Sequence, residues 1–541
     1  MREPARLTKC MLAIIMIFVN GMHTGGGVRV LGRPALLIPM LVLIAGVLYG
    51  LRFFHLSPFA ASWDEVDFVL ALERYDLLAM QPHFPGYPYF ILAGEGAMTA
   101  VDHPVMALSL VSAWAGLWSL LLLRWIASFY LNAVWSWLLV LAVAALSSLW
   151  VVQAGPMSES MGIATVLFLL ACSLQSAKYL QQDGVRPLRR GLCWWLTALF
   201  ASGLVLGTRL SYAPFCVSLL VPWWLLMRRS GLWAKGLYTS LSLALWVSFQ
   251  GVWLAALAHT EGGMANFLQL ALGFTSGHFA EWGGTYALAS SLFHRLFLFF
   301  GRNLLFAGLA GGEWLTFGFL FAWIALAAVV LGRGIRSVSV DWQHLSASWW
   351  MLFLSVGAYA AWAFFAQNVD KPRHVLVLLP FLLLLLFRLL QSAFKQGGRA
   401  LRGAMILLLG LWLVGNGVSG YALAREQAGV PPPTYQLARY LEQLPDPERA
   451  VVFSWEEDRV LGYLEVPVAH KRVFTYSLFL ADANQRLLHG QRIWLTNAVA
   501  EGFRQQGIEG LERHLRSVAT FHGDPRIHPV YHSITLYEWT R

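Results

Sequence analysis

Eleven apolar runs, each about as long as a helix needs to cross a bilayer, constrain this chain more than any other feature. Backbone groups in hydrocarbon must satisfy their own hydrogen bonds, so these runs are predicted to be transmembrane α-helices. Only 13% of the 541 residues are charged, against about 25% in soluble domains. We therefore predict a polytopic α-helical membrane protein with about 11 transmembrane helices, at 34–53, 104–127, 133–153, 157–175, 192–208, 211–227, 236–258, 314–332, 347–366, 375–393 and 403–424.

The net charge of +10 does not indicate nucleic-acid binding, because the basic residues are scattered in short clusters between apolar runs. With the N-terminus inside, every cluster lies on the cytoplasmic side, as the positive-inside rule requires. The clusters are Lys178, Arg186, Arg189 and Arg190; Arg228, Arg229 and Lys235; Arg333 and Arg336; and Lys395, Arg399 and Arg402.

The same topology places the loop after the first span, residues 259–291 and 367–374, and the whole C-terminus outside the cell. Residues 288–311 are apolar enough to cross, but they carry His294, Arg295 and Arg302. A crossing there would move the later basic clusters outside, so we expect an interfacial or re-entrant helix.

Three domains follow from these patterns. Residues 1–30 form an N-terminal extension with a basic start and an apolar run that is short for a span. Whether this run is the core of a signal peptide stays open. Residues 31–427 form the multi-span domain. After a linker at Pro431–Pro433, residues 428–541 are predicted to form a small extracytoplasmic α/β domain. Its expected helices are Thr434–Leu444 and Ala498–Leu515, and its expected strands are Ala450–Trp455, Arg472–Ser477, Ile493–Thr496 and Ser533–Trp539.

The first outer loop carries an acidic cluster of Asp64, Glu65 and Asp67. Carboxylates at a membrane interface carry a desolvation cost, which favours a functional explanation. Ser62 and Glu65 also fit a capping box, which accounts for Glu65 and partly for Asp64. Local sequence alone leaves capping and catalysis equally weighted.

Further outer residues are candidates for substrate binding. Three prolines at every third position, Pro82 to Pro88, match polyproline II and would hold His83 and Tyr87 in fixed directions, although a structural role for His83 is favoured. Glu159 opens the fourth span as either a helix cap or a site carboxylate. A glycine-rich loop adds a weaker set: His278, Glu281 and Trp282.

Four basic outer residues depart from the positive-inside bias: Arg209, Lys371, Arg373 and His374. Arg209 alone fits a snorkelling side chain. A guanidinium fork beside an ammonium suits phosphate binding, which favours that role for the cluster from Lys371 to His374.

An acidic motif after the first span, a carboxylate at an outer helix mouth, and Pro-Arg-His before a late span together resemble the GT-C fold of membrane glycosyltransferases. Within this fold, the chain resembles bacterial relatives of protein O-mannosyltransferases and of lipid A aminoarabinose transferases. The resemblance implies that Asp64 is the catalytic base, that Glu159 shapes the site, and that Arg373 binds a lipid-linked phosphate. The chain has Val-Asp after Trp-Asp-Glu where relatives often have Pro-Arg-Tyr, which leaves Asp67 open as the base.

One acidic cluster together with several basic outer residues suits inverting transfer of a sugar from a polyprenyl-phosphate donor to an acceptor hydroxyl on a glycan, lipid or protein. A phosphate leaving group needs cations rather than a second carboxylic acid. The cysteines and His83 lack metal-ligand spacing, so no metal site is predicted. The sequence identifies no cofactor, and a divalent cation stays open. A transporter or flippase of a lipid-linked or glycan substrate, or a non-catalytic scaffold, remain the alternatives.

Overall fold

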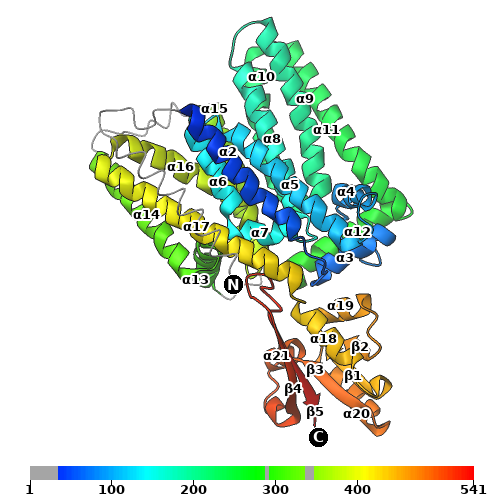
Figure 1. The fold of residues 1–541 in the computed structure, drawn as a ribbon. Coiled ribbons are helices and arrows are strands. Elements are labelled where there is room, and N and C mark those ends of the chain that lie inside the picture. Colours follow the sequence, from blue (N-terminus) through cyan, green and yellow to red (C-terminus); the bar gives the residue numbers. More distant parts are fainter. Residues whose placement is uncertain (1–33, 287–290, 335–345, 541) are drawn as a thin grey trace.

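The computed structural model describes residues 34–286, 291–334 and 346–540, so the expected extension at residues 1–30 lies outside the described residues. A large bundle of long helices stands on a small domain that contains the sheet and the C-terminus (Figure 1). The described residues contain 11 helices long and apolar enough to cross a membrane. The predicted fold class is confirmed.

These candidate spans are single helices or helices in continuous pairs: α2 (Pro34–Gly50) with η1 (Leu51–Phe54), α5 (Pro104–Ala127), α8 (Glu159–Leu180), α9 (Val185–Thr208), η2 (Leu210–Leu219) with α10 (Leu220–Arg229), α11 (Leu232–Thr260), α13 (Leu292–Leu296) with η5 (Phe297–Leu309), α14 (Trp314–Gly334), α15 (Ala347–Ala366), η8 (Pro372–Leu378) with α16 (Leu379–Gln396), and α17 (Arg399–Gly429). The shorter helices of the bundle are α3 (Trp63–Glu73), α4 (Pro88–Met98) and α12 (Met264–Gly277), followed by the π-helix η3 (His278–Trp282).

The predicted span 133–153 is not one straight helix. It consists of α6 (Ala133–Ala145) and α7 (Ser147–Ala154), which meet at an angle of 62°. The Ala144 carbonyl accepts hydrogen bonds from the side chains of Arg52 (2.8 Å) and Trp150 (3.0 Å), and the Asn416 side chain accepts one from the Ser147 amide (3.3 Å). Side chains therefore satisfy the backbone groups that the break in the helix releases.

The segment expected to be interfacial has the length and apolarity of a span, from Leu292 to Leu309. Its N-terminal end is tied to the C-terminal end of α15, because Arg295 donates to the carbonyls of Phe364 (2.6 Å) and Gln367 (2.6 Å). Beyond its other end, Gly312 lies against Arg526 of the small domain. Both ends thus lie at the same end of the bundle, which favours a segment that does not cross.

The small domain contains a five-stranded mixed sheet in the order β2-β1-β3-β5-β4. The strands are β1 (Ala450–Ser454), β2 (Ala469–Arg472), β3 (Arg492–Thr496), β4 (Leu515–His522) and β5 (Ser533–Trp539). β1 pairs in parallel with β2 and β3, whereas β5 runs antiparallel to β3 and β4. Alternate residues of β1 enter separate apolar clusters on the two faces of the sheet, with Val451 in one and Val452 in the other.

The helices of this domain are α18 (Pro433–Glu442), α19 (Glu457–Tyr463), α20 (Tyr476–Leu488) and α21 (Asn497–Gln505). Two predictions were wrong here. The strand expected at Arg472–Ser477 ends at Arg472, and α20 begins behind the Thr475 cap, whose side chain accepts from the Leu478 amide. The helix expected at Ala498–Leu515 stops at Gln505, because Gly507 and Gly510 take positive φ angles of 78° and 75° that favour glycine.

The small domain is joined closely to the bundle. Only Val430 to Pro432 separate α17 from α18, so the proline run is a short connection. Side by side at the junction lie α3 and α19 (Figure 1), and Arg459 of α19 contacts Asp67 of α3 at 2.9 Å. This junction encloses the site described next.

Candidate active site

A cavity of about 400 Å³ lies between the helix bundle and the small domain. The start of α3, the N-terminal end of α8, η5, the start of η8 and α17 supply the bundle side of its wall, and Pro525 to Tyr531 supply much of the other. Its described ionisable lining residues are Asp64, Glu65, Glu159, Arg302, Lys371, Arg373, Glu456, Arg526, His528 and Tyr531. The cavity therefore gathers both signs of charge from segments that are far apart in the sequence.

The predicted capping box of α3 is present. The Glu65 carboxylate accepts from the backbone amides of Ala61 (2.7 Å) and Ser62 (3.0 Å), and the Ser62 side chain faces the Glu65 amide. Burial nevertheless raises the pKa of Glu65 to about 7, since these hydrogen bonds offset only part of the desolvation. The cap fixes the direction of the neighbouring residue, Asp64.

Asp64 forms an ion pair with Arg373 at the start of η8. Both side chains are about a quarter exposed, at 26% and 23%. Burial opposes ionisation of Asp64, but the charge of Arg373, assisted by His83 and Lys371, outweighs it and holds its pKa well below the usual range. Asp64 is thus ionised and already committed to a cation in this state.

Glu159 is fully buried at the first position of α8 and pairs with Arg209 at 3.0 Å. Arg209 is held from behind by a 2.7 Å hydrogen bond to Ser158. The Nε of Arg373 lies 3.6 Å from the same Glu159 oxygen, so Arg373 stands between two carboxylates. Neither Glu159 oxygen accepts a hydrogen bond from the described residues, so the ion pairs leave acceptor capacity at the cavity wall.

Asp67 faces away from this network. It is fully buried and contacts His83 at 3.1 Å and Arg459 at 2.9 Å, and His83 in turn contacts the Tyr87 hydroxyl at 3.0 Å. Arg459 also donates to the carbonyls of Ala79 and Met80. This arrangement ties the small domain to the loop after the first span, and Asp67 is absent from the described cavity lining.

Comparison with known proteins gives a fold but no sequence family. No protein-family model matches the chain, and no curated protein matches its sequence. ArnT from Cupriavidus metallidurans in the apo state has a TM-score of 0.51 and 14% identity, over 92% of this chain and 98% of that chain. The Archaeoglobus fulgidus oligosaccharyltransferase in the apo form has a TM-score of 0.51 and 12% identity, over 86% and 70%. ArnT bound to undecaprenyl phosphate is also similar, with a TM-score of 0.48 and 15% identity over 94% and 98%.

Both proteins are GT-C membrane glycosyltransferases. This chain has the GT-C fold. The predicted resemblance is confirmed at the level of the fold, and the small C-terminal α/β domain belongs to the same likeness because the ArnT match spans nearly the whole chain.

The GT-C cavity brings together some of the predicted site residues and not others. Asp64, Glu65, Glu159, Lys371 and Arg373 line it, with Arg209 directly behind Glu159. The described lining leaves out the remaining candidates: Asp67, His83, Tyr87, His278, Glu281 and His374. The Trp282 side chain lies outside the described part of the chain.

The omitted candidates have other contacts. His278 bonds to the Ala366 carbonyl at 2.8 Å, and the Tyr359 hydroxyl donates to the carbonyl of His374. His83 and Tyr87 lie in a segment of turns, with a hydrogen bond from the Gly86 amide to the His83 carbonyl, so the expected polyproline II helix is not formed. Their direction is set by Asp67 instead.

Sequence reasoning missed five lining residues: Arg302, Glu456, Arg526, His528 and Tyr531. Four of them belong to the small domain. No local sequence pattern indicated that loops of this domain would form a wall of the cavity. Arg302 could have been found from the sequence, because it is a cation within an apolar segment. Within the described ranges, no group of three His, Cys, Asp or Glu side chains has an arrangement suited to a metal ion.

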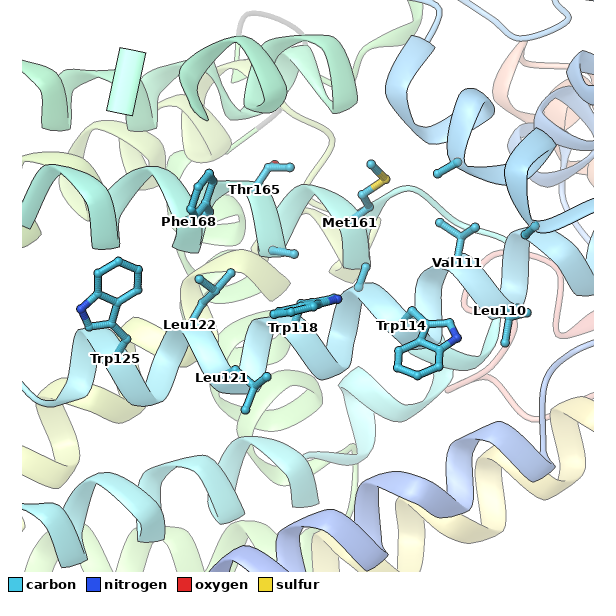
Figure 2. A pocket seen from close by; sticks show the side chains of 14 residues that line it. Leu110, Val111, Trp114, Trp118, Leu121, Leu122, Trp125, Met161, Thr165 and Phe168 are labelled. Atoms are coloured by element: carbon cyan, nitrogen blue, oxygen red, sulfur yellow. The ribbon is translucent and has the colours of Figure 1, made fainter. Parts of the chain in front are cut away.

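A second cavity, of about 810 Å³, lies along α4, α5 and α8. Figure 2 shows Trp114, Trp118 and Trp125 on one wall, with Met161 and Phe168 on the other. Trp114 and Trp118 are more than half exposed, and no charged side chain is among the lining residues. This cavity suits hydrocarbon, so the ionic chemistry belongs to the cavity at the domain junction.

Proposed function

We propose that this protein is an inverting glycosyltransferase that moves a sugar from a polyprenyl-phosphate donor to an acceptor hydroxyl on the outer face of the membrane. The observation that carries the proposal is the contact between Asp64 and Arg373, which are 309 residues apart in sequence and meet in one cavity beside Glu159. A carboxylate and a guanidinium there supply a proton acceptor and a phosphate-binding group.

The reaction needs one bond to form and one to break at the anomeric carbon. The acceptor oxygen attacks that carbon while the bond to the phosphate oxygen breaks, and the bonding electrons leave with the phosphate. The acceptor proton passes to Asp64. A single displacement of this kind inverts the anomeric centre.

The ion pair makes Asp64 a weak base until the donor is bound, because Arg373 holds its pKa well below the usual range. A donor phosphate competes with Asp64 for the same guanidinium. As Arg373 turns to the phosphate, Asp64 loses its counter-ion and its proton affinity rises. Donor binding thereby activates the base.

Glu159 fits a role in holding the sugar. It is fully buried, lines the cavity and retains acceptor capacity on both oxygens among the described residues. A carboxylate can accept hydrogen bonds from sugar hydroxyls, and the pair with Arg209 fixes the orientation of Glu159. The sugar and the acceptor are not specified by these contacts.

The proposal is tested by transfer of a radiolabelled sugar from synthetic polyprenyl-phosphate sugars by the purified full-length protein. Arg373→Gln removes one charge-assisted hydrogen bond, which is worth about 1.5–3 kcal/mol, and should lower kcat/KM for the donor roughly 10- to 150-fold. Acceptor dependence should change little. Transport of the lipid-linked sugar across vesicles without any transfer would establish the transporter alternative instead.

A further inference from the structure

Arg302 lines the cavity, and it belongs to the apolar segment whose crossing of the membrane was in question. It lies on η5, a π-helix, and such helices are frequent at functional sites. The next residue, Asn303, is almost fully buried and donates its side-chain amide to the Val369 carbonyl at 2.6 Å. That bond holds η5 against the turn that carries Lys371, so both cations line the same cavity.

Among the basic side chains at the cavity, Arg302 and Lys371 differ from the others because no carboxylate pairs with them in the described part of the chain. Arg373 is paired with Asp64, and Arg209 with Glu159. Arg526 is paired with Asp524 and Glu313. Burial lowers the pKa of His528 to about 4, so it is neutral at pH 7. Within the described part of the chain, neither Arg302 nor Lys371 makes an ion pair or a side-chain hydrogen bond.

We propose that Arg302 and Lys371 form an anion subsite that binds the phosphate of the lipid-linked donor. This inference rests on the proposed function. The phosphate in the donor is a diester with one negative charge, and it departs as a monoester that carries nearly two at neutral pH. Two unpaired cations stabilise the departing group more than the bound donor, and only such a difference accelerates the reaction.

The subsite also sets the order of events at the neighbouring ion pair. Arg302 and Lys371 are free to receive the phosphate first, while Arg373 is still held by Asp64. Arg373 then turns from Asp64 to the bound phosphate, which frees Asp64 to act as the base before the bond breaks. The alternative is that Arg302 is an interfacial anchor whose charge only reaches the membrane surface.

The experiment is a titration of undecaprenyl phosphate into the purified full-length protein in phosphatidylcholine nanodiscs, by microscale thermophoresis. Arg302→Gln and Lys371→Gln should each weaken binding about tenfold or more, since each loses a charge-assisted hydrogen bond. Arg302→Lys, which keeps the charge, should retain most of the binding and guards against a folding defect. The matched control is Arg74→Gln, because that side chain is 74% exposed and lies outside the cavity.

Uncharged undecaprenol supplies the second arm, since its affinity should be the same for wild type and Arg302→Gln. Wild-type affinity for undecaprenyl phosphate in both glutamine variants would overturn the subsite and leave the proposed function intact. An equal loss for undecaprenol would make Arg302 a structural residue. If the folded wild-type protein binds no lipid phosphate at all, the proposed function itself fails.

Discussion

Replacing Asp64 with Asn should affect turnover and lipid-phosphate affinity in opposite directions. Loss of a general base lowers kcat about 10²- to 10⁴-fold. The same change removes the counter-ion of Arg373 while preserving size and hydrogen-bonding capacity. Because a general structural defect weakens both functions together, tighter binding with slower turnover is a signature of the proposed ion-pair exchange.

The size of the affinity gain follows from the geometry of the pair. Both side chains are about a quarter exposed, so the Asp64–Arg373 contact lies at the lower end of the range for a charge-assisted hydrogen bond, about 1.5 kcal/mol. Releasing Arg373 from that competition should tighten binding of undecaprenyl phosphate about tenfold. Thermophoresis in nanodiscs measures the affinity, and transfer of the labelled sugar measures kcat.

Asp183→Asn is the matched control, because that carboxylate is fully exposed and lies outside the cavity. Near-wild-type turnover in Asp64→Asn would refute the assignment. A pH profile then identifies the remaining candidate. Burial raises the pKa of Glu65 to about 7, so a reaction that uses Glu65 as base loses rate as pH falls through 7. With Asp64 as base, that acid limb lies lower.

Two further predictions concern the junction and the topology. Asp67→Asn leaves Arg459 without its buried counter-ion, which should destabilise the protein by about 3–5 kcal/mol; thermal unfolding should show a large drop in Tm, and an unchanged Tm would remove Asp67 from the domain joint. Leu488 lies on the small domain and is 77% exposed. The variant Leu488→Cys should therefore react with a membrane-impermeant maleimide on intact cells. The variant Gln182→Cys, at a predicted cytoplasmic turn, should react only after lysis. The reverse pattern would place the site on the cytoplasmic face.

The sequence by itself determined the class of fold. Apolar length and the distribution of Lys and Arg depend only on local composition, so they predicted most of the spans. Local strand patterns likewise predicted β1 and β5 of the small domain. The capping box around Glu65 was also readable, because its two partners are three residues apart. The prediction of one straight helix over residues 133–153 was wrong. The bend at Leu146 is stabilised by the side chains of Asn416 and Arg52, which are distant in sequence.

Only the tertiary structure decided which charged groups share a site. Asp64 and Asp67 are three residues apart on one helix, yet one faces the cavity and Arg373 while the other is buried against Arg459. Likewise, Arg302 became a candidate because Asn303 binds Val369 and brings η5 beside Lys371. A sequence lists charges, but their pairing depends on distances between segments hundreds of residues apart. The electrostatic energy that sets each carboxylate's proton affinity depends on those same distances.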